Sequence, residues 1–190
     1  MITASVSHVA AYARWKADED MPVGVLVNQI VSNVETEAML KGTAFHKFLE
    51  HAQAGSETEL AEANGYTFAF VGDFNLYLPQ MREWRKSKDY GGITVSGQVD
   101  AIEGKTIYDH KTTERFDAEK NLESWQHRYY LDIFGADRFV WNVWEMNELK
   151  EPKSYGVNKL HNLTAYRYPE LEADCTNLAL EYADFARRYL

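Results

Sequence analysis

The chain has 190 residues, of which 45% are hydrophobic and 26% charged, a balance typical of a folded globular protein and not of a disordered one. The formal net charge of -9 argues against a protein that coats nucleic acid or an anionic membrane through bulk charge. The single cysteine, Cys175, excludes an internal disulfide and a four-cysteine iron–sulfur or zinc site.

The length suits one domain with its own core, and we expect residues 1–190 to form it. The first residues lack a basic region followed by a continuous apolar run, so no signal peptide is expected. No apolar run approaches the roughly 18 residues of a membrane-spanning helix, so a membrane partner is not expected. One cysteine fits a reducing compartment, and the expected location is cytoplasmic.

Helices are expected in the first third of the chain. Ser5 or Ser7 can cap a helix that runs to Trp15, with apolar residues following at helical spacing. Residues 25–34 are apolar and β-branched, and they fit a strand or a helix equally. Residues 35–54 predict a long helix, because their apolar side chains recur every three or four positions.

Two more helices are expected before the centre of the chain. Residues 57–63 predict a short acidic helix, and residues 68–85 predict a longer one despite Pro79. The second of these ends in a basic run, formed by Arg82, Arg85, Lys86 and Lys88.

The second half predicts a sheet with helices around it. Residues 94–102 alternate between apolar and polar positions, Glu103-Gly104 is a turn signal, and residues 105–111 are the partner strand. The remaining expected elements are a helix over 116–133, strands over 138–146 and 153–166, and a helix over 170–189. The expected fold class is therefore mixed α/β, with a central mixed β-sheet flanked by helices.

The predicted hairpin gathers Asp100, Asp109 and Lys111. Side chains of paired strand residues share a face, so a turn with an even number of residues puts all three on one face. A three-residue turn would put Asp100 on the opposite face from Asp109. Converging carboxylates bind Mg²⁺ or Mn²⁺, which polarises a phosphoryl oxygen and lowers the pKa of a bound water. A nearby lysine can then orient or deprotonate that water, or neutralise charge in the transition state.

An ordinary surface is the alternative for these three residues. Asp-x-Lys is a common tripeptide, and the solvated face of a strand often carries alternating charge. The hairpin by itself leaves both interpretations open.

The pattern extends beyond the hairpin. Four motifs resemble, in order, those of the PD-(D/E)XK nuclease superfamily and of its RecB-like exonucleases. They are Gly42-Thr-Ala-Phe-His46, Gly97-Gln-Val-Asp100, Asp109-His-Lys111-Thr112 and Gln126-His-Arg-Tyr-Tyr130. Each motif is weak alone, and the order and spacing of the four carry the resemblance.

The resemblance implies a restriction-endonuclease-like core and a role for each matched residue. The implied metal ligands are His46, Asp100, Asp109 and the main-chain carbonyl of His110, and the implied metal is Mg²⁺ or Mn²⁺. The implied catalytic set is Asp100, Asp109 and Lys111, with Gln126 and Tyr130 lining the site. A purely structural role stays open as the alternative for three of these residues: a core histidine for His46, a surface amide for Gln126 and a core ring for Tyr130.

Binding of DNA by so acidic a chain requires a local positive channel. The candidates are Arg82, Arg85, Lys86 and Lys88, together with Lys120 and Arg128 and, around the site, Lys41 and Lys47. The alternative for the run from Arg82 to Lys88 is an ordinary solvated helix end.

Departures from the family pattern exclude two kinds of family member. With one cysteine the chain is unlike the iron–sulfur members, and without a Walker A pattern it lacks the helicase part of RecB-type machines. What is left resembles a stand-alone phage or prophage exonuclease. Many relatives carry an acid before the first site strand, and Asp89 is the nearest candidate here.

The expected function is therefore a metal-dependent DNA exonuclease of recombination, repair or phage DNA processing. An endonuclease of the same superfamily and an inactive nucleic-acid-binding relative are the alternatives. The expected partner is DNA. A single-strand annealing protein and a homo-oligomer stay open, because neither leaves a mark in the sequence.

Overall fold

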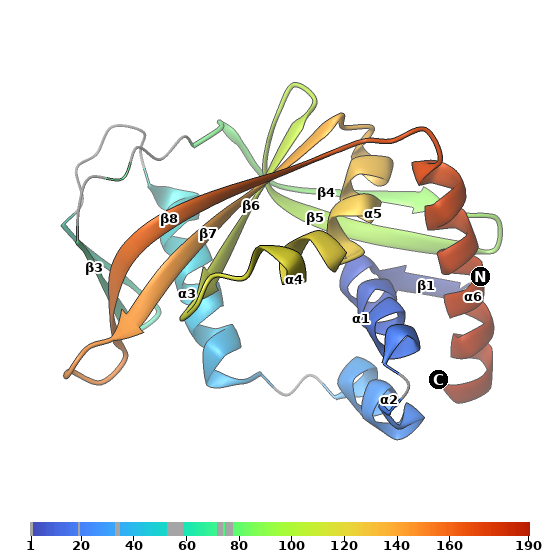
Figure 1. Cartoon of the computed structure of the whole chain (residues 1–190), viewed down its shortest axis with the longest axis horizontal. Coiled ribbons are helices and arrows are strands. Elements are labelled where there is room, and N and C mark those ends of the chain that lie inside the picture. The colour runs from blue at the N-terminus through green and yellow to red at the C-terminus, as the bar shows by residue number, and fades with distance from the viewer. Residues whose placement is uncertain (1, 19, 33–34, 53–58, 72–73, 75–77) are drawn as a thin grey trace.

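The computed structural model describes residues 2–18, 20–32, 35–52, 59–71, 74 and 78–190. Within these residues eight strands form one mixed sheet with helices packed on it, so the expected mixed α/β class is confirmed (Figure 1). The helices are α1 Val6–Ala17, α2 Val23–Val31, α3 Glu37–His51, α4 Ala118–Glu123, α5 Gln126–Phe134 and α6 Leu171–Tyr189. The strands are β1 Ile2–Ser5, β2 Leu60–Ala63, β3 Tyr66–Phe70, β4 Met81–Asp89, β5 Ile93–Glu103, β6 Thr106–Thr113, β7 Arg138–Glu148 and β8 Ser154–Tyr166. No helix of these residues is long and apolar enough to cross a membrane.

The sheet runs in the order β1-β5-β6-β7-β8-β3-β2, and β4 pairs with β5 off this path. β4 lies antiparallel along one edge of β5, from Asp89 opposite Thr94 to Met81 opposite Ile102. The other edge of β5 is divided between β1, at residues 93–96, and β6, at residues 101–103. On this edge residues 97–100 of β5 pair with neither β1 nor β6, so the sheet is open between these two strands.

Two apolar cores lie on opposite faces of the sheet. Phe139, Trp141 and Val143 of β7 belong to the core that includes buried residues of α1, α5 and α6. Trp144 of β7 belongs to the second core, with Phe45 of α3. Successive strand residues point to opposite faces, so β7 separates the two cores. Figure 1 shows α1, α2 and α6 gathered at one end of the molecule and α3 apart from them.

Caps fix several helix ends close to where the sequence predicts them. The side chain of Ser5 accepts a hydrogen bond from the His8 amide and caps α1, and Thr36 caps α3 in the same way. Residues 23–31 form α2, which settles the open choice for residues 25–34 as a helix; residues 33–34 lie outside the described part. Gly135, with φ 66°, ends α5 in the left-handed conformation.

The expected helices over 57–63 and 68–85 are wrong where the structure describes them. Residues 60–63 and 66–70 are the antiparallel pair β2 and β3, and residues 81–89 are β4. Pairing with β5 and β8 decides these segments, and it outweighs helical spacing of apolar residues. The expected helix over 116–133 is two helices, because Ser124 and Trp125 separate α4 from α5.

Candidate functional site

The hairpin turn has two residues, so the expected even number is confirmed. Glu103 pairs with Thr106 and Ile102 with Ile107, which leaves Gly104 and Lys105 in the turn, one position later than expected. Gly104 has φ 55°, a conformation that glycine adopts at no steric cost. The register continued from Ala101 and Tyr108 leads to Asp100 and Asp109 as the next opposed positions.

Asp100 lies where β5 and β6 part. The paired register ends at Ala101 and Tyr108, and the carboxylate then takes the place of a strand carbonyl: Oδ2 accepts the backbone N–H of His110 at 2.7 Å. Asp100 is thereby fixed at the opening of the sheet.

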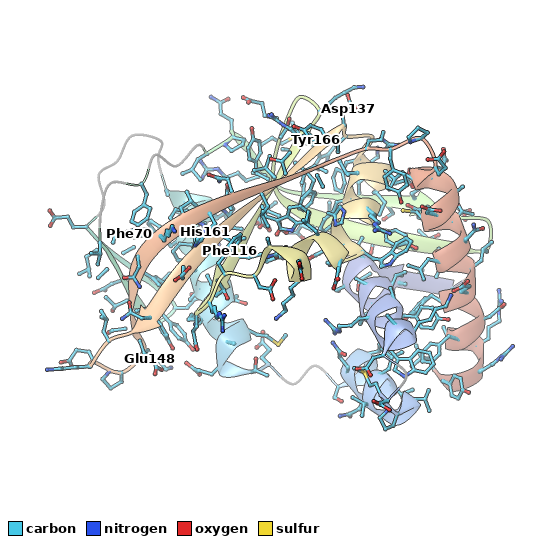
Figure 2. All side chains as sticks on the ribbon, viewed as in Figure 1. Phe70, Phe116, Asp137, Glu148, His161 and Tyr166 are labelled. Atoms are coloured by element: carbon cyan, nitrogen blue, oxygen red, sulfur yellow. The ribbon has the colours of Figure 1, made fainter. Side chains whose placement is uncertain are left out.

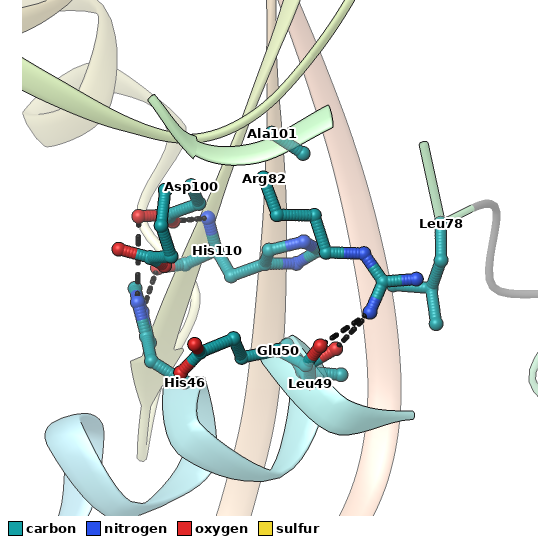
Figure 3. A pocket seen from close by; sticks show the side chains of 9 residues that line it. His46, Leu49, Glu50, Leu78, Arg82, Asp100, Ala101 and His110 are labelled. Atoms are coloured by element: carbon teal, nitrogen blue, oxygen red, sulfur yellow. Dashed lines mark hydrogen bonds and ion pairs between the residues drawn. The ribbon is translucent and has the colours of Figure 1, made fainter. Parts of the chain in front are cut away.

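His46 of α3 completes a contact between three predicted ligands (Figure 3). Its Nε2 donates to the main-chain carbonyl of His110 at 2.6 Å, and its Nδ1 lies 3.4 Å from Oδ1 of Asp100. Burial lowers the pKa of His46, but the Asp100 carboxylate outweighs burial and raises the pKa above its ordinary value. Burial raises the pKa of Asp100, but His46 outweighs it and holds that pKa below its ordinary value.

Asp109 and Lys111 form the second half of the cluster. Lys111 Nζ donates to Oδ1 of Asp109 at 3.1 Å; it lies equally close to Oδ2, but no donor is oriented to hydrogen-bond that buried oxygen. Burial raises the pKa of Asp109 to about 6, with the negative Asp100 adding to the effect against Lys111. Burial lowers the pKa of Lys111, but the two carboxylates raise it above its ordinary value.

The chemistry of these donors fits a hard divalent cation. Two carboxylates, one carbonyl and one imidazole are ligands that Mg²⁺ or Mn²⁺ accepts, and the orphaned Oδ2 of Asp109 lacks a donor. As they stand, no three His, Cys, Asp or Glu side chains of the described residues are arranged to hold a metal. In addition, His46 donates its Nε2 proton to the His110 carbonyl, and that proton must leave before Nε2 can bind a cation.

A cavity of about 10 Å³ lies against this cluster, room for roughly one water. His46, Asp100 and His110 line it together with Arg82 and Glu83 (Figure 3). Glu83 is an acid beside the site that the sequence patterns did not single out, in the strand before β5 where Asp89 was the expected candidate. Its φ of 53° is a local irregularity of β4 and a signal that only coordinates provide.

Gln126 and Tyr130 lie on α5, which covers the same opening. Gln126 Nε2 donates to the Tyr130 hydroxyl at 3.3 Å, and burial raises the pKa of Tyr130 to about 12, with Asp109 contributing. The Tyr130 ring packs on Gly97, where an added β-carbon would lie 2.6 Å from the ring. Gly42 has no such need, because a β-carbon there would be 3.6 Å from Thr112.

The basic run lies on β4, and two of its four cations are engaged inside the protein. Arg82 Nη1 donates to the carbonyls at the end of α3, and Lys88 pairs with Asp132 at 3.0 Å and with Glu172 at 2.8 Å. Arg85 and Lys86 are exposed, and Arg85 donates to Gln98. The run is therefore only half available to a ligand.

The other expected cations also differ in availability. Lys41 is buried over the Tyr155 ring, Lys47 pairs with Glu50, and Arg128 packs over the ring of Trp125. Lys120 is exposed and lines an open groove of about 750 Å³ that begins at Lys111.

Sequence reasoning missed this groove and two of its residues. Arg115 and Phe116 line it, and the Phe116 ring stacks on His161 with centroids 4.0 Å apart and planes 5° from parallel (Figure 2). A cation and an aromatic residue directly after the Asp109-His-Lys111-Thr112 motif were the available signal.

Comparison with known proteins adds information on the fold. No protein-family model matches the chain, and no curated protein matches it. Chains of solved structures do match, among them one described as "Crystal structure of SSO0001". The two chains are 16% identical with a TM-score of 0.51, over 97% of this chain and 76% of that chain. The likeness supports the mixed α/β arrangement.

Proposed function

We propose that the chain is a metal-dependent deoxyribonuclease of the PD-(D/E)XK type that hydrolyses phosphodiester bonds, acting as an exonuclease. The observation that carries the proposal is a pair of neighbouring contact sets from α3, β5 and β6: His46 with Asp100 and the His110 main chain, and Asp109 with Lys111, with Asp100 close enough to act on the pKa of Asp109. The groups involved are the imidazole of His46, the carboxylates of Asp100 and Asp109, the carbonyl of His110 and the ammonium of Lys111.

An inert ion-pair cluster explains this arrangement less well. Asp109 is 4% exposed, and one of its carboxylate oxygens has no hydrogen-bond donor. The Lys111 ammonium lies 3.1 Å from that oxygen without a hydrogen bond to it, so its burial is only partly compensated. A cation bound at this oxygen would satisfy it.

A bound Mg²⁺ or Mn²⁺ would supply charge neutralisation and a more acidic water at the phosphate. His46, Asp100, Asp109 and the His110 carbonyl would hold it. Burial lowers the pKa of Lys111, but without a bound cation the two carboxylates outweigh burial and raise that pKa, so the side chain is an ammonium. We assign this ammonium to stabilise negative charge on the phosphate. Burial, and then the charge of Asp109, raise the pKa of Tyr130 to about 12, so its hydroxyl is protonated at neutral pH and can act as a hydrogen-bond donor.

The test compares wild type with Asp109→Ala and Lys111→Ala on end-labelled linear DNA, with Mg²⁺, with Mn²⁺ and with EDTA. Wild type should degrade the DNA only with metal, and each variant should be slower by roughly 100-fold or more. Asp137→Asn is the matched control, because Asp137 pairs with the exposed Lys105 at 3.1 Å, away from the site. A wild type inert under all conditions, or an Asp109→Ala variant as active as wild type, would refute the proposal.

Two substrate forms separate the remaining classes. An exonuclease leaves covalently closed circular DNA intact and consumes the linear form, whereas an endonuclease of the same superfamily cuts both. An inactive DNA-binding relative cuts neither and still shifts labelled DNA in a binding assay.

A further inference from the structure

The groove that starts at Lys111 has the size of a ligand site. Its volume of about 750 Å³ lies within the roughly 300–1,000 Å³ of clefts that hold small ligands. The end of β6, the loop into α4, the first residues of α4 and Val143 of β7 line it.

The charge of the groove opposes that of the whole protein. Three cations line it, Lys111, Arg115 and Lys120, against one acid, Asp117. Lys111 is already paired with Asp109 at 3.1 Å, so Arg115 and Lys120 carry the positive charge that the groove offers to a ligand. The Asp117 carboxylate is engaged in a helix cap, because it accepts a hydrogen bond from the Lys120 amide at the start of α4. The side chains of Arg115 and Lys120 are exposed and form no ion pair with described residues. In a chain of net charge -9, this lining favours an anion.

An aromatic residue is held rigidly in the same groove. The half-buried Phe116 stacks on His161, whose Nε2 in turn lies 2.8 Å from Glu145 of β7 (Figure 2). The loop before Phe116 is closed by Thr113, whose hydroxyl donates to the Arg115 carbonyl and accepts the Arg115 amide. Phe116 is thus held against His161, in a groove that Arg115 and Lys120 also line.

We propose that this groove binds a single-stranded segment of DNA, with Arg115 and Lys120 on its phosphates and an unpaired base stacked against Phe116. The identity of the ligand as DNA rests on the proposed function. The single-stranded state follows from the aromatic residue, because paired bases are stacked inside a duplex and present only their edges. Cations interleaved with an aromatic platform are what strand-tracking grooves use.

The test measures binding in EDTA, where cleavage plays no part. A fluorescein-labelled thymidine dodecanucleotide and a blunt duplex of the same length are titrated with wild type and variants by anisotropy over a salt series. Arg115→Ala with Lys120→Ala should weaken binding of the single strand and flatten its salt slope by about 1.4, for two lost phosphate contacts. Lys150→Ala with Arg188→Ala is the control, since it removes the same charge at exposed positions outside the groove.

Phe116→Ala should weaken binding of the single strand by roughly 5- to 100-fold without changing the salt slope. Phe116→Tyr should retain the wild-type affinity, and Phe116→Leu serves if the alanine variant does not fold. Wild type should bind the blunt duplex more weakly, and the Phe116 variants should leave that affinity unchanged.

The outcomes separate the groove from the nuclease. The inference is overturned if the Arg115→Ala/Lys120→Ala variant and the Phe116 variants all bind the single strand as tightly as wild type. This holds whether or not the protein cuts DNA. Equal losses for duplex and single strand overturn it too, in favour of a duplex-binding surface. If the variants lose single-strand binding while wild type cuts no DNA, the result supports DNA binding in the groove and refutes the proposed nuclease activity.

Discussion

Tyr130 packs on Gly97 so closely that a β-carbon at position 97 would lie 2.6 Å from its Cε1 atom. Val6 closes the other side at 2.9 Å. Gly97 is therefore the residue that lets α5 approach β5 at the opening of the sheet. The glycine of the Gly97-Gln-Val-Asp100 motif has a packing reason that is independent of any chemistry.

Gly97→Ala and Gly42→Ala should move stability in opposite directions. Alanine at 97 overpacks the contact with Tyr130 and should lower the free energy of unfolding by about 1–3 kcal/mol. Alanine at 42, inside α3, meets only Thr112 at 3.6 Å and should raise it by about 0.5–1 kcal/mol. Urea unfolding measures both, and equal changes would show that the Gly97 contact is soft.

Two buried aspartates should respond differently to replacement by asparagine. Asp132 is fully partnered, by Lys88 and by the Tyr90 hydroxyl at 2.7 Å, so Asp132→Asn should lower stability by about 2 kcal/mol or more. Asp109 carries an unsatisfied oxygen, so Asp109→Asn should raise stability by about 1 kcal/mol in EDTA while nuclease activity is lost. Thermal unfolding without metal gives both values. Destabilisation by Asp109→Asn would identify Asp109–Lys111 as a structural ion pair.

Arg82 should act on stability and not on DNA. Its Nη1 donates to the carbonyls of Leu49, Glu50 and Ala52, which the last turn of α3 leaves without partners. Arg82→Ala should lower the free energy of unfolding by about 2–3 kcal/mol, and the folded variant should bind DNA like wild type. Lys86→Ala is the comparison, because this exposed residue should change stability by less than about 0.5 kcal/mol. A large loss of DNA affinity in the folded Arg82 variant would restore it as a phosphate ligand.

His127 predicts acid sensitivity. Burial, and then the charge of Arg128, lower its pKa to about 4 from an ordinary 6.5, and its Nδ1 has no hydrogen-bond partner. Between pH 4 and 6.5 the unfolded chain binds a proton at His127 that the folded chain does not bind. The contribution of neutral His127 to the free energy of unfolding is therefore fully present above pH 6.5 and is lost as the pH falls toward 4. The loss is at most about 3 kcal/mol.

Replacing His127 by Phe should flatten the dependence of unfolding free energy on pH between 6.5 and 4. The ring would stay among Phe139 and Trp141, which already contact the imidazole. Part of the slope should remain in the variant, because burial lowers the pKa of His110 to about 4 as well.

The candidate site was predictable wherever local rules fix geometry. A turn of even length between Asp100 and Asp109 follows from the Glu103-Gly104 signal, although the turn lies one residue later. The helical position of His46 follows from its apolar spacing. Its contact with the His110 carbonyl does not, because it depends on how α3 docks on β6.

The basic run shows what the sequence could not give. Met81 to Asp89 is polar and rich in residues that favour helices, and only its pairing with β5 makes it a strand. Within this strand Glu83 has a positive φ of 53°. On either side of it, Arg82 hydrogen-bonds to the end of α3 and Trp84 packs against Phe134 of α5. No propensity or period in the sequence encodes these contacts.

The contact between His46 and the His110 carbonyl joins residues 64 positions apart, whereas Asp100 and His110 are ten apart. Loop closure favours near neighbours, so the hairpin can bring its two acids together early in folding. The imidazole arrives only when α3 docks. Assembly of the site is therefore a late event in folding, and local unfolding of α3 would dismantle it while the hairpin stays paired.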